Sequence, residues 1–178
     1  MLSENPWVLG TAGSALCVAD GEGRNSVFLA QQGLDVTSFD LSPTAIERTG
    51  KLAASADVTV DAHTSEWSDW DWSQTFDLTV AIFVQFTGTE ERPQQFADLR
   101  GATKPGGRLV LHGFTPKQIE YGTGGPPVAE NMYTDELLAD AFADWNILRL
   151  ASYERAQSSG TAHVGQAALI DLVAEKPE

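Results

Sequence analysis

Apolar residues along this chain gather in short runs, with polar segments of helical period between them. The run at 78–85 is almost continuously apolar, which is typical of a strand buried on both faces of a sheet. The pattern predicts strands at 14–19, 35–39, 58–62, 78–85, 108–113, 146–153 and 165–174. It predicts helices at 25–32, 43–56, 91–103 and 135–142.

The order of these elements favours an α/β fold. Crossovers between parallel strands are almost always right-handed, so the first five strands are expected to run parallel. The last two strands lie close together in the chain and are expected to form an antiparallel hairpin at one edge of the sheet. We therefore predict a single domain over 1–178, a three-layer sandwich around a mostly parallel, seven-stranded sheet.

Composition limits the partners and the compartment. Hydrophobic residues make up 42% of the 178 residues, enough for a sizeable core. A formal net charge of -14 disfavours nucleic acids and anionic membrane surfaces as partners. One cysteine forms no internal disulfide, and the chain has neither a membrane-span pattern nor a signal-peptide pattern. We expect a cytoplasmic protein.

The most informative motif follows the first predicted strand. That strand ends at a turn with two glycines, Gly21 and Gly23, and a predicted helix follows. The second predicted strand is closed by Asp40. Glycines let a ligand approach the backbone closely, and an acid at this distance can hold both hydroxyls of a ribose. The pattern indicates a Rossmann-like, nucleotide-binding βαβ unit.

The charges in this turn indicate which kind of nucleotide it binds. Asp20 and Glu22 flank the first glycine, whereas a dinucleotide would bring a pyrophosphate to the same helix N-terminus. Ser26 stands where the third glycine of a dinucleotide fingerprint would be. A nicotinamide-dependent dehydrogenase is therefore disfavoured. S-adenosylmethionine has no phosphate and carries a sulfonium, so it suits an acidic turn better.

Five segments together carry a family resemblance. They are GEGRN at 21–25, VTSFDLSP at 36–43, FDLTVAIF at 76–83, KPGGRLVL at 104–111 and GTGGPP at 122–127. In these segments the chain resembles class I S-adenosylmethionine-dependent methyltransferases. More narrowly, it resembles the small bacterial branch grouped with tellurite-resistance-type and thiopurine-type methyltransferases. The resemblance implies S-adenosylmethionine as the cofactor and a small-molecule methyl acceptor, with a thiol or a metalloid compound among the candidates.

The same resemblance implies the residues that hold the cofactor, because ligands in such sheets lie beyond the carboxyl ends of the strands. The expected cofactor-binding residues are Asp20, Gly21, Gly23, Asn25, Asp40, Leu41, His63 and Phe83. The alternative for Asp40 is a helix-capping or turn acid, and for His63 a histidine of a surface turn. The tryptophans at 67, 70 and 72 either stack on adenine or cap the core, and we favour the second.

The acceptor is expected at the neighbouring strand ends and in the long loop at 116–133, since long loops in compact domains usually serve function. Gln85, Tyr121 and Gly124 are the expected substrate residues. No catalytic residue is fixed by the sequence. An oxygen or nitrogen acceptor would use His112 or His163 as a base, whereas a thiolate would need little help. The alternatives for His163 and the loop are an exposed histidine and a mobile loop. No metal site is expected.

Two departures from the family pattern leave other functions open. Cys17 and Ala19 stand where the family has an acid and a first glycine, and Asp20 is expected to take over part of the acid's role. About fifteen residues precede the first strand, so most of the family's N-terminal lid is expected to be lacking. The alternative function is therefore a non-catalytic or partner-dependent S-adenosylmethionine-binding domain. In a homodimer, the second subunit would supply the lid.

Overall fold

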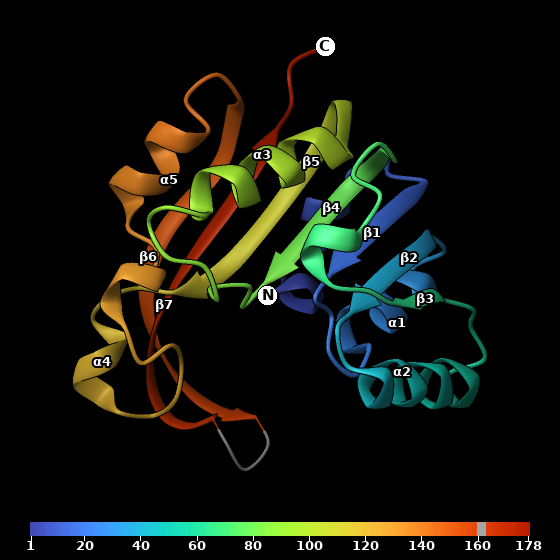
Figure 1. The fold of residues 1–178 in the computed structure, drawn as a ribbon, viewed down its shortest axis with the longest axis horizontal. Helices are drawn as coiled ribbons and strands as arrows, with labels where there is room; N and C mark the ends of the chain where they lie inside the picture. Colours follow the sequence, from blue (N-terminus) through green and yellow to red (C-terminus); the bar gives the residue numbers. More distant parts are fainter. Residues whose placement is uncertain (160–162) are drawn as a thin grey trace.

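A computed structural model describes the backbone of residues 1–159 and 163–178 and the side chains of 1–156 and 165–178. Within these residues seven strands form one sheet in the order β3-β2-β1-β4-β5-β7-β6 (Figure 1). The strands are β1 (Ser14–Val18), β2 (Asp35–Asp40), β3 (Asp61–Thr64), β4 (Phe76–Ile82), β5 (Thr103–Phe114), β6 (Asn146–Ser159) and β7 (His163–Glu175).

The first five strands pair in parallel, and β7 runs antiparallel to both β5 and β6. The predicted α/β sandwich with an antiparallel hairpin at one edge is therefore confirmed. The helices of the described part are α1 (Arg24–Gln31), α2 (Pro43–Ser55), α3 (Arg92–Ala102), α4 (Gln118–Tyr121) and α5 (Asp135–Ala141). Short 3₁₀ turns lie at Leu2–Glu4, Pro6–Leu9, Trp67–Asp69 and Ala129–Asn131.

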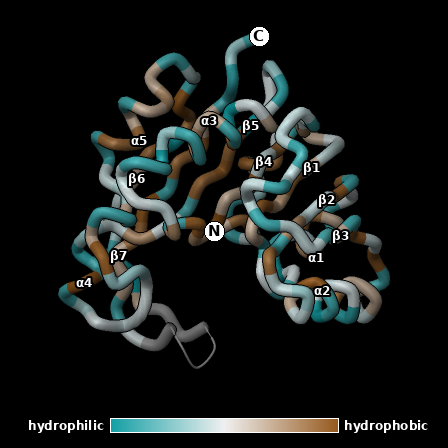
Figure 2. The backbone as a smooth tube through the Cα atoms, in the orientation of Figure 1, coloured by the Kyte–Doolittle hydropathy of each residue, from teal (hydrophilic) through white to brown (hydrophobic). Residues whose placement is uncertain are grey.

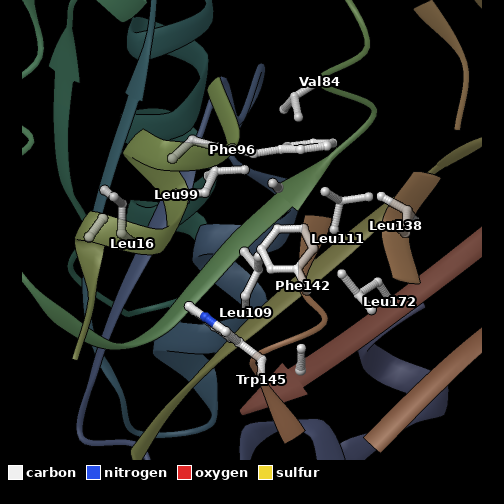
Figure 3. Close-up of a cluster of buried hydrophobic side chains, with 14 of the residues drawn as sticks. Leu16, Val84, Phe96, Leu99, Leu109, Leu111, Leu138, Phe142, Trp145 and Leu172 are labelled. Atoms are coloured by element: carbon white, nitrogen blue, oxygen red, sulfur yellow. The ribbon is translucent and has the colours of Figure 1, made fainter. Parts of the chain in front are cut away.

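Two apolar clusters hold the layers together, one on each face of the sheet. On one face, side chains of β4 and β5 meet Phe96 and Leu99 of α3 and Leu138 of α5 (Figure 3). On the other face, Leu29 of α1 and Val8 of the N-terminal turns cover β1. Figure 2 shows the hydrophobic stretches along the central strands and the hydrophilic ones on the outer helices. This placement leaves the carboxyl ends of the central strands free to build a site.

Several predicted strand boundaries were wrong, and β3 was displaced at both ends. The prediction was a strand at 58–62, because Val58 and Val60 are apolar. The strand is Asp61–Thr64, an edge strand whose side chains are mostly exposed and therefore give no apolar signal. The last two strands extend beyond the predicted 146–153 and 165–174. Strand β5 begins at Thr103, before the predicted 108, because Thr103 already pairs with Phe76 of β4 across an irregularity. Helix α4 was not predicted.

Asp77 joins the starts of three strands. Its Oδ2 accepts hydrogen bonds from the Ser14 backbone N–H and hydroxyl, both at 2.8 Å, and its Oδ1 accepts one from Lys104 Nζ at 2.8 Å. The bond from Lys104, followed by those from Ser14, holds the pKa of the Asp77 carboxyl well below its ordinary value. A carboxylate with a lowered pKa stabilises the fold only while it is ionised.

We expect Asp77→Asn to lower the free energy of unfolding at pH 7 by about 1 kcal/mol, a small value because Asp77 and Lys104 are partly exposed. The contribution is fully present above the unfolded carboxyl's pKa of about 4 and is lost as the pH falls further. Urea titrations from pH 7 to pH 3 should therefore show the variant approaching the wild type at the acid end. A difference that grows on acidification would contradict this reading.

No helix in the part of the chain that the structure describes is long and apolar enough to cross a bilayer.

Candidate functional site: two cavities beside the glycine turn

The turn after β1 adopts backbone angles that favour glycine. Gly21 and Gly23 have φ of 63° and 83°. A Cβ on Gly23 would lie 2.6 Å from Cγ2 of Thr49 on α2, so only glycine fits between α1 and α2 there. A Cβ on Gly21 would meet nothing within 4 Å. The turn is therefore packed tightly on its inner side at Gly23 and open to an approaching ligand at Gly21.

Asp20 fixes the start of α1. Its Oδ1 accepts a hydrogen bond from Asn25 Nδ2 at 3.1 Å, and its Oδ2 accepts one from the Ser26 backbone N–H at 3.3 Å. Burial raises the pKa of this carboxyl, although the bonds from Ser26 and Asn25 act in the opposite direction. Cys17, which stands where the family has an acid, is buried in the apolar cluster. Asp20 thus holds the turn, and its predicted contact with the cofactor stays a prediction.

Asp40 links the two turns at the ends of β1 and β2. Its Oδ2 accepts a hydrogen bond from the Gly21 backbone N–H at 2.9 Å, and its Oδ1 accepts one from the Ser42 N–H at 2.9 Å. Ser42, not Asp40, caps α2, through a bond from the Ala45 N–H at 3.3 Å. Asp40 therefore combines the turn role with a place in the wall of a cavity, and a carboxylate retains lone pairs for a ligand.

This first cavity has a volume of about 700 Å³ and a mostly apolar wall. Leu41, directly after Asp40, lines it although 74% of its surface is exposed. The wall of this cavity also includes Trp67, Trp72, Phe86, Ser65 and Glu66. An acid beside an exposed leucine and three aromatic rings is the surface that a nucleoside needs, with a carboxylate for the sugar hydroxyls and a flat apolar slot for the base.

The tryptophans pack against the core, as favoured from the sequence, and adenine stacking stays a prediction. Trp70 stacks on Phe39 of β2 with ring centroids 4.5 Å apart, and it covers the core there. Trp67 and Trp72 also pack against the core and in addition line the first cavity. The indole N–H of Trp67 donates to Asp98 Oδ2 of α3 at 2.7 Å, which fixes its ring at the cavity wall.

His63 lies on β3 itself, because the strand is shifted along the chain. Its Nε2 lies 3.0 Å from Oδ2 of Asp61, and its ring meets Trp70 edge to face. Ser65 and Glu66, which follow β3, are the residues that line the first cavity at this end of the sheet. Sequence reasoning missed them because it placed the end of β3 too early. The adenine contact predicted for His63 stays a prediction.

A second cavity of about 520 Å³ lies beyond the ends of β4 and β5. Phe83, with φ of 59°, and the almost fully buried His112 line it. Its other lining residues are Met1, Ser3, Glu4, Arg24, Asn25, Ile82, Tyr153, Arg155, Ala156 and Leu169. Ala19 lines the first cavity and Arg24 the second, so the glycine turn lies between them.

The N-terminal segment covers this second cavity. Leu2 and Val8 are buried, and Glu4 and Arg155 of β6 form two hydrogen bonds of 2.6 Å across the cavity's edge. The residues before β1 form the two short 3₁₀ turns at Leu2–Glu4 and Pro6–Leu9.

Of the three predicted substrate residues, only Gln85 lines a smaller hollow of about 320 Å³. Its buried amide also bonds the backbone N–H and C=O of Phe114 at 2.6 and 2.7 Å, which joins the ends of β4 and β5. From the GTGGPP segment, Gly125 and Pro126 line the hollow. Tyr121 instead bonds Glu154 at the surface, and the carbonyl of Gly124 accepts from Gln118. Their substrate roles stay predictions.

His163 begins β7, but its side chain lies outside the described residues. Within the described part no group of three or more His, Cys, Asp or Glu side chains converges to hold a metal ion.

The fold is Rossmann-like, and the first cavity lies at the switch point of its sheet, where such folds bind their ligands. A family model described as a methyltransferase domain matches residues 15–107, just over half of the chain, and the chain belongs to this family. The resemblance to class I methyltransferases, and with it the predicted class of enzyme, is thereby confirmed.

Individual relatives are distant. Hemagglutinin 1 of Eikenella corrodens is 28% identical over 141 residues, which are 76% of this chain and 44% of that protein. The chain thus spans less than half the length of this curated relative. TehB from Haemophilus influenzae is 16% identical with a TM-score of 0.76, over 98% of this chain and 61% of that one. The N-methyltransferase NodS from Bradyrhizobium japonicum WM9, solved in complex with S-adenosyl-L-homocysteine, is 14% identical with a TM-score of 0.76, over 99% and 85%.

Proposed function

We propose that this protein binds S-adenosylmethionine across the glycine turn and transfers its methyl group to a small-molecule acceptor. One observation carries the proposal: Asp40 lies in the wall of an apolar cavity and bonds the backbone of Gly21, where the turn is open. When bound, this cofactor supplies an electrophilic methyl group on a sulfonium, so the protein needs no covalent intermediate of its own.

The residues of the first cavity fit such a ligand. The carboxylate of Asp40 would accept the ribose hydroxyls, and Leu41 would cover one face of the adenine. Trp67 and Phe86 would close the slot from the side of α3. The sulfonium end would lie toward Phe83 and Asn25, beyond the glycine turn. The chain's main task is then to align acceptor and methyl carbon and to exclude water.

The acceptor is expected to be small, because the hollow next to Phe83 holds about 320 Å³. Phe86 and Phe114 make its wall aromatic. A thiol or metalloid acceptor and the tellurite-resistance-like branch stay predictions from the resemblance. The homodimer and the cytoplasmic location also stay predictions.

The test is calorimetric titration with S-adenosylmethionine and S-adenosylhomocysteine, with NAD as the control ligand. Asp40→Ala removes charge-assisted hydrogen bonds, each worth about 1.5–3 kcal/mol, so we expect an affinity lower by about 10- to 100-fold. Asp35→Ala, an exposed acid at the start of the same strand, is the matched control and should bind as the wild type does.

Circular dichroism of both variants would show that they are folded. A folded wild-type protein that binds neither adenosyl compound, or that binds NAD more tightly, would contradict the proposed function.

A further inference from the structure

A buried histidine–aspartate pair lies at the inner wall of the second cavity. Nδ1 of His112 on β5 lies 2.7 Å from Oδ1 of Asp171, its register partner on β7. Two residues of β6 also bond this carboxylate: Arg149 Nε donates to Oδ2 at 2.9 Å and the Tyr153 hydroxyl to Oδ1 at 3.2 Å. Asp171 is 1% exposed and His112 5% exposed. Three strands therefore hold this imidazole in one orientation.

The pair also fixes which nitrogen of His112 carries a proton. Burial alone would raise the pKa of Asp171, but the bonds from His112 and Arg149 outweigh it and lower that pKa, so the carboxyl is ionised at neutral pH. An ionised carboxylate only accepts, so Nδ1 must carry the proton. When the ring carries this proton alone, Nε2 keeps a free lone pair, and His112 lines the second cavity.

This imidazole lies next to the point where methyl transfer is proposed. The ring of Phe83, directly after β4, packs on His112 at 4.8 Å between centroids, and the Phe83 N–H donates to the His112 carbonyl at 2.8 Å. Phe83 lines both the second cavity and the aromatic hollow. A small acceptor in this region would therefore meet His112 from one side and the glycine turn from the other.

We propose that His112 is a catalytic general base held in place by Asp171. The methyl acceptor is then a small molecule with a hydroxyl or an amine, so that its nucleophilic atom carries a proton. This inference rests on the proposed function. The oxygen or nitrogen of the acceptor forms a bond to the methyl carbon as the carbon–sulfur bond breaks, and the sulfur keeps the electron pair. The acceptor's proton passes to Nε2 of His112.

The surrounding charges suit this role. The imidazolium formed would be stabilised by Asp171, while Arg149 on the far side of the carboxylate keeps Asp171 ionised. At the cavity edge Arg155 is neutralised by Glu4. A thiolate or an anionic metalloid acceptor has no proton to lose and would gain little from such a base.

Three aromatic probes that differ only in the nucleophilic atom test the proposal: phenol, aniline and thiophenol. Thiophenol is largely ionised at neutral pH, whereas phenol is not. With S-adenosylmethionine as donor, His112→Gln should lower the turnover of phenol and aniline by about a hundredfold or more. It should leave the methylation of thiophenol nearly unchanged. Asp171→Asn should act in the same selective way, and Asp144→Asn, a surface acid paired with Arg100, is its matched control.

A second measurement does not depend on turnover. Nitrogen-15 NMR of the labelled imidazoles should show His112 protonated at Nδ1, and Asp171→Asn should change that tautomer. A ring protonated at Nε2 would overturn the proposal, as would an equal loss of phenol and thiophenol turnover in His112→Gln. The affinity for S-adenosylhomocysteine distinguishes failure of the proposed function from failure of the proposal for His112. A wild-type protein that does not bind S-adenosylhomocysteine would contradict the proposed function. If the wild type binds S-adenosylhomocysteine but methylates phenol no faster than the His112→Gln variant does, only the role of His112 as a base is contradicted.

Discussion

Replacement of Gly23 by alanine is expected to lower the free energy of unfolding by about 2–5 kcal/mol. Two costs add: the positive φ of 83°, about 1–2 kcal/mol for an L-residue, and the new Cβ at 2.6 Å from Thr49 Cγ2, an overpacking cost of about 1–3 kcal/mol. Thr49 has little room to give way, because its hydroxyl bonds the carbonyls of Gly21 and Ala45 at 3.3 and 3.1 Å. Urea denaturation measures the loss.

Two further variants separate these costs. Gly33 has φ of 89° but nothing within 4 Å of an added Cβ, so Gly33→Ala should show the backbone cost alone, about 1–2 kcal/mol. Thr49→Ala removes two of the three nearest atoms, so Gly23→Ala should cost less in that background. Equal losses in Gly23→Ala and Gly33→Ala would show that α1 and α2 are not packed as described.

Asp171→Ala is expected to be more damaging, with a loss of about 3–5 kcal/mol in the free energy of unfolding. The substitution leaves Arg149 and the Nδ1–H of His112 facing a hole in a buried region, and both lose a hydrogen-bond acceptor. Asp171→Asn keeps the shape and an oxygen acceptor, so it should cost much less. The comparison uses denaturant unfolding at pH 7 monitored by tryptophan fluorescence.

Asp144→Ala provides the matched control for a broken ion pair at the surface. Its carboxylate pairs with Arg100 at 2.5 Å but is mostly exposed, so we expect a change within about 1 kcal/mol. If Asp171→Ala were as mild as Asp144→Ala, the three-strand network around Asp171 would not be formed in solution.

The sequence predicted the part of the fold that depends on local backbone chemistry. Gly21 and Gly23 indicated the turn after β1, and Asp40 indicated the acid at the end of β2, because both features depend on residue types that are recognisable in the sequence. It predicted the α2 start equally well, since Ser42 followed by Pro43 is a local capping signal.

Features that depend on tertiary pairing could not be predicted. Edge strand β3 has mostly exposed side chains, so the prediction followed the neighbouring valines and placed the strand too early in the chain. The sequence suggested His112 but not its partner, because Asp171 lies 59 residues further along the chain and only the β5–β7 register brings the two together. One signal was available: a single acid inside the apolar run at 167–174 is costly unless it is paired.

The strand order also constrains how the sheet is assembled. β7 follows β6 in the chain, yet it is β7 that pairs with β5, and β6 reaches the sheet only through β7. The 14 residues of β6 therefore have no template until the strand synthesised after them is in place. The hairpin must form first or dock as a unit, and the His112–Asp171 pair comes into being only at that step. The proposed base is therefore held in its orientation only once the last strand of the chain pairs with β5.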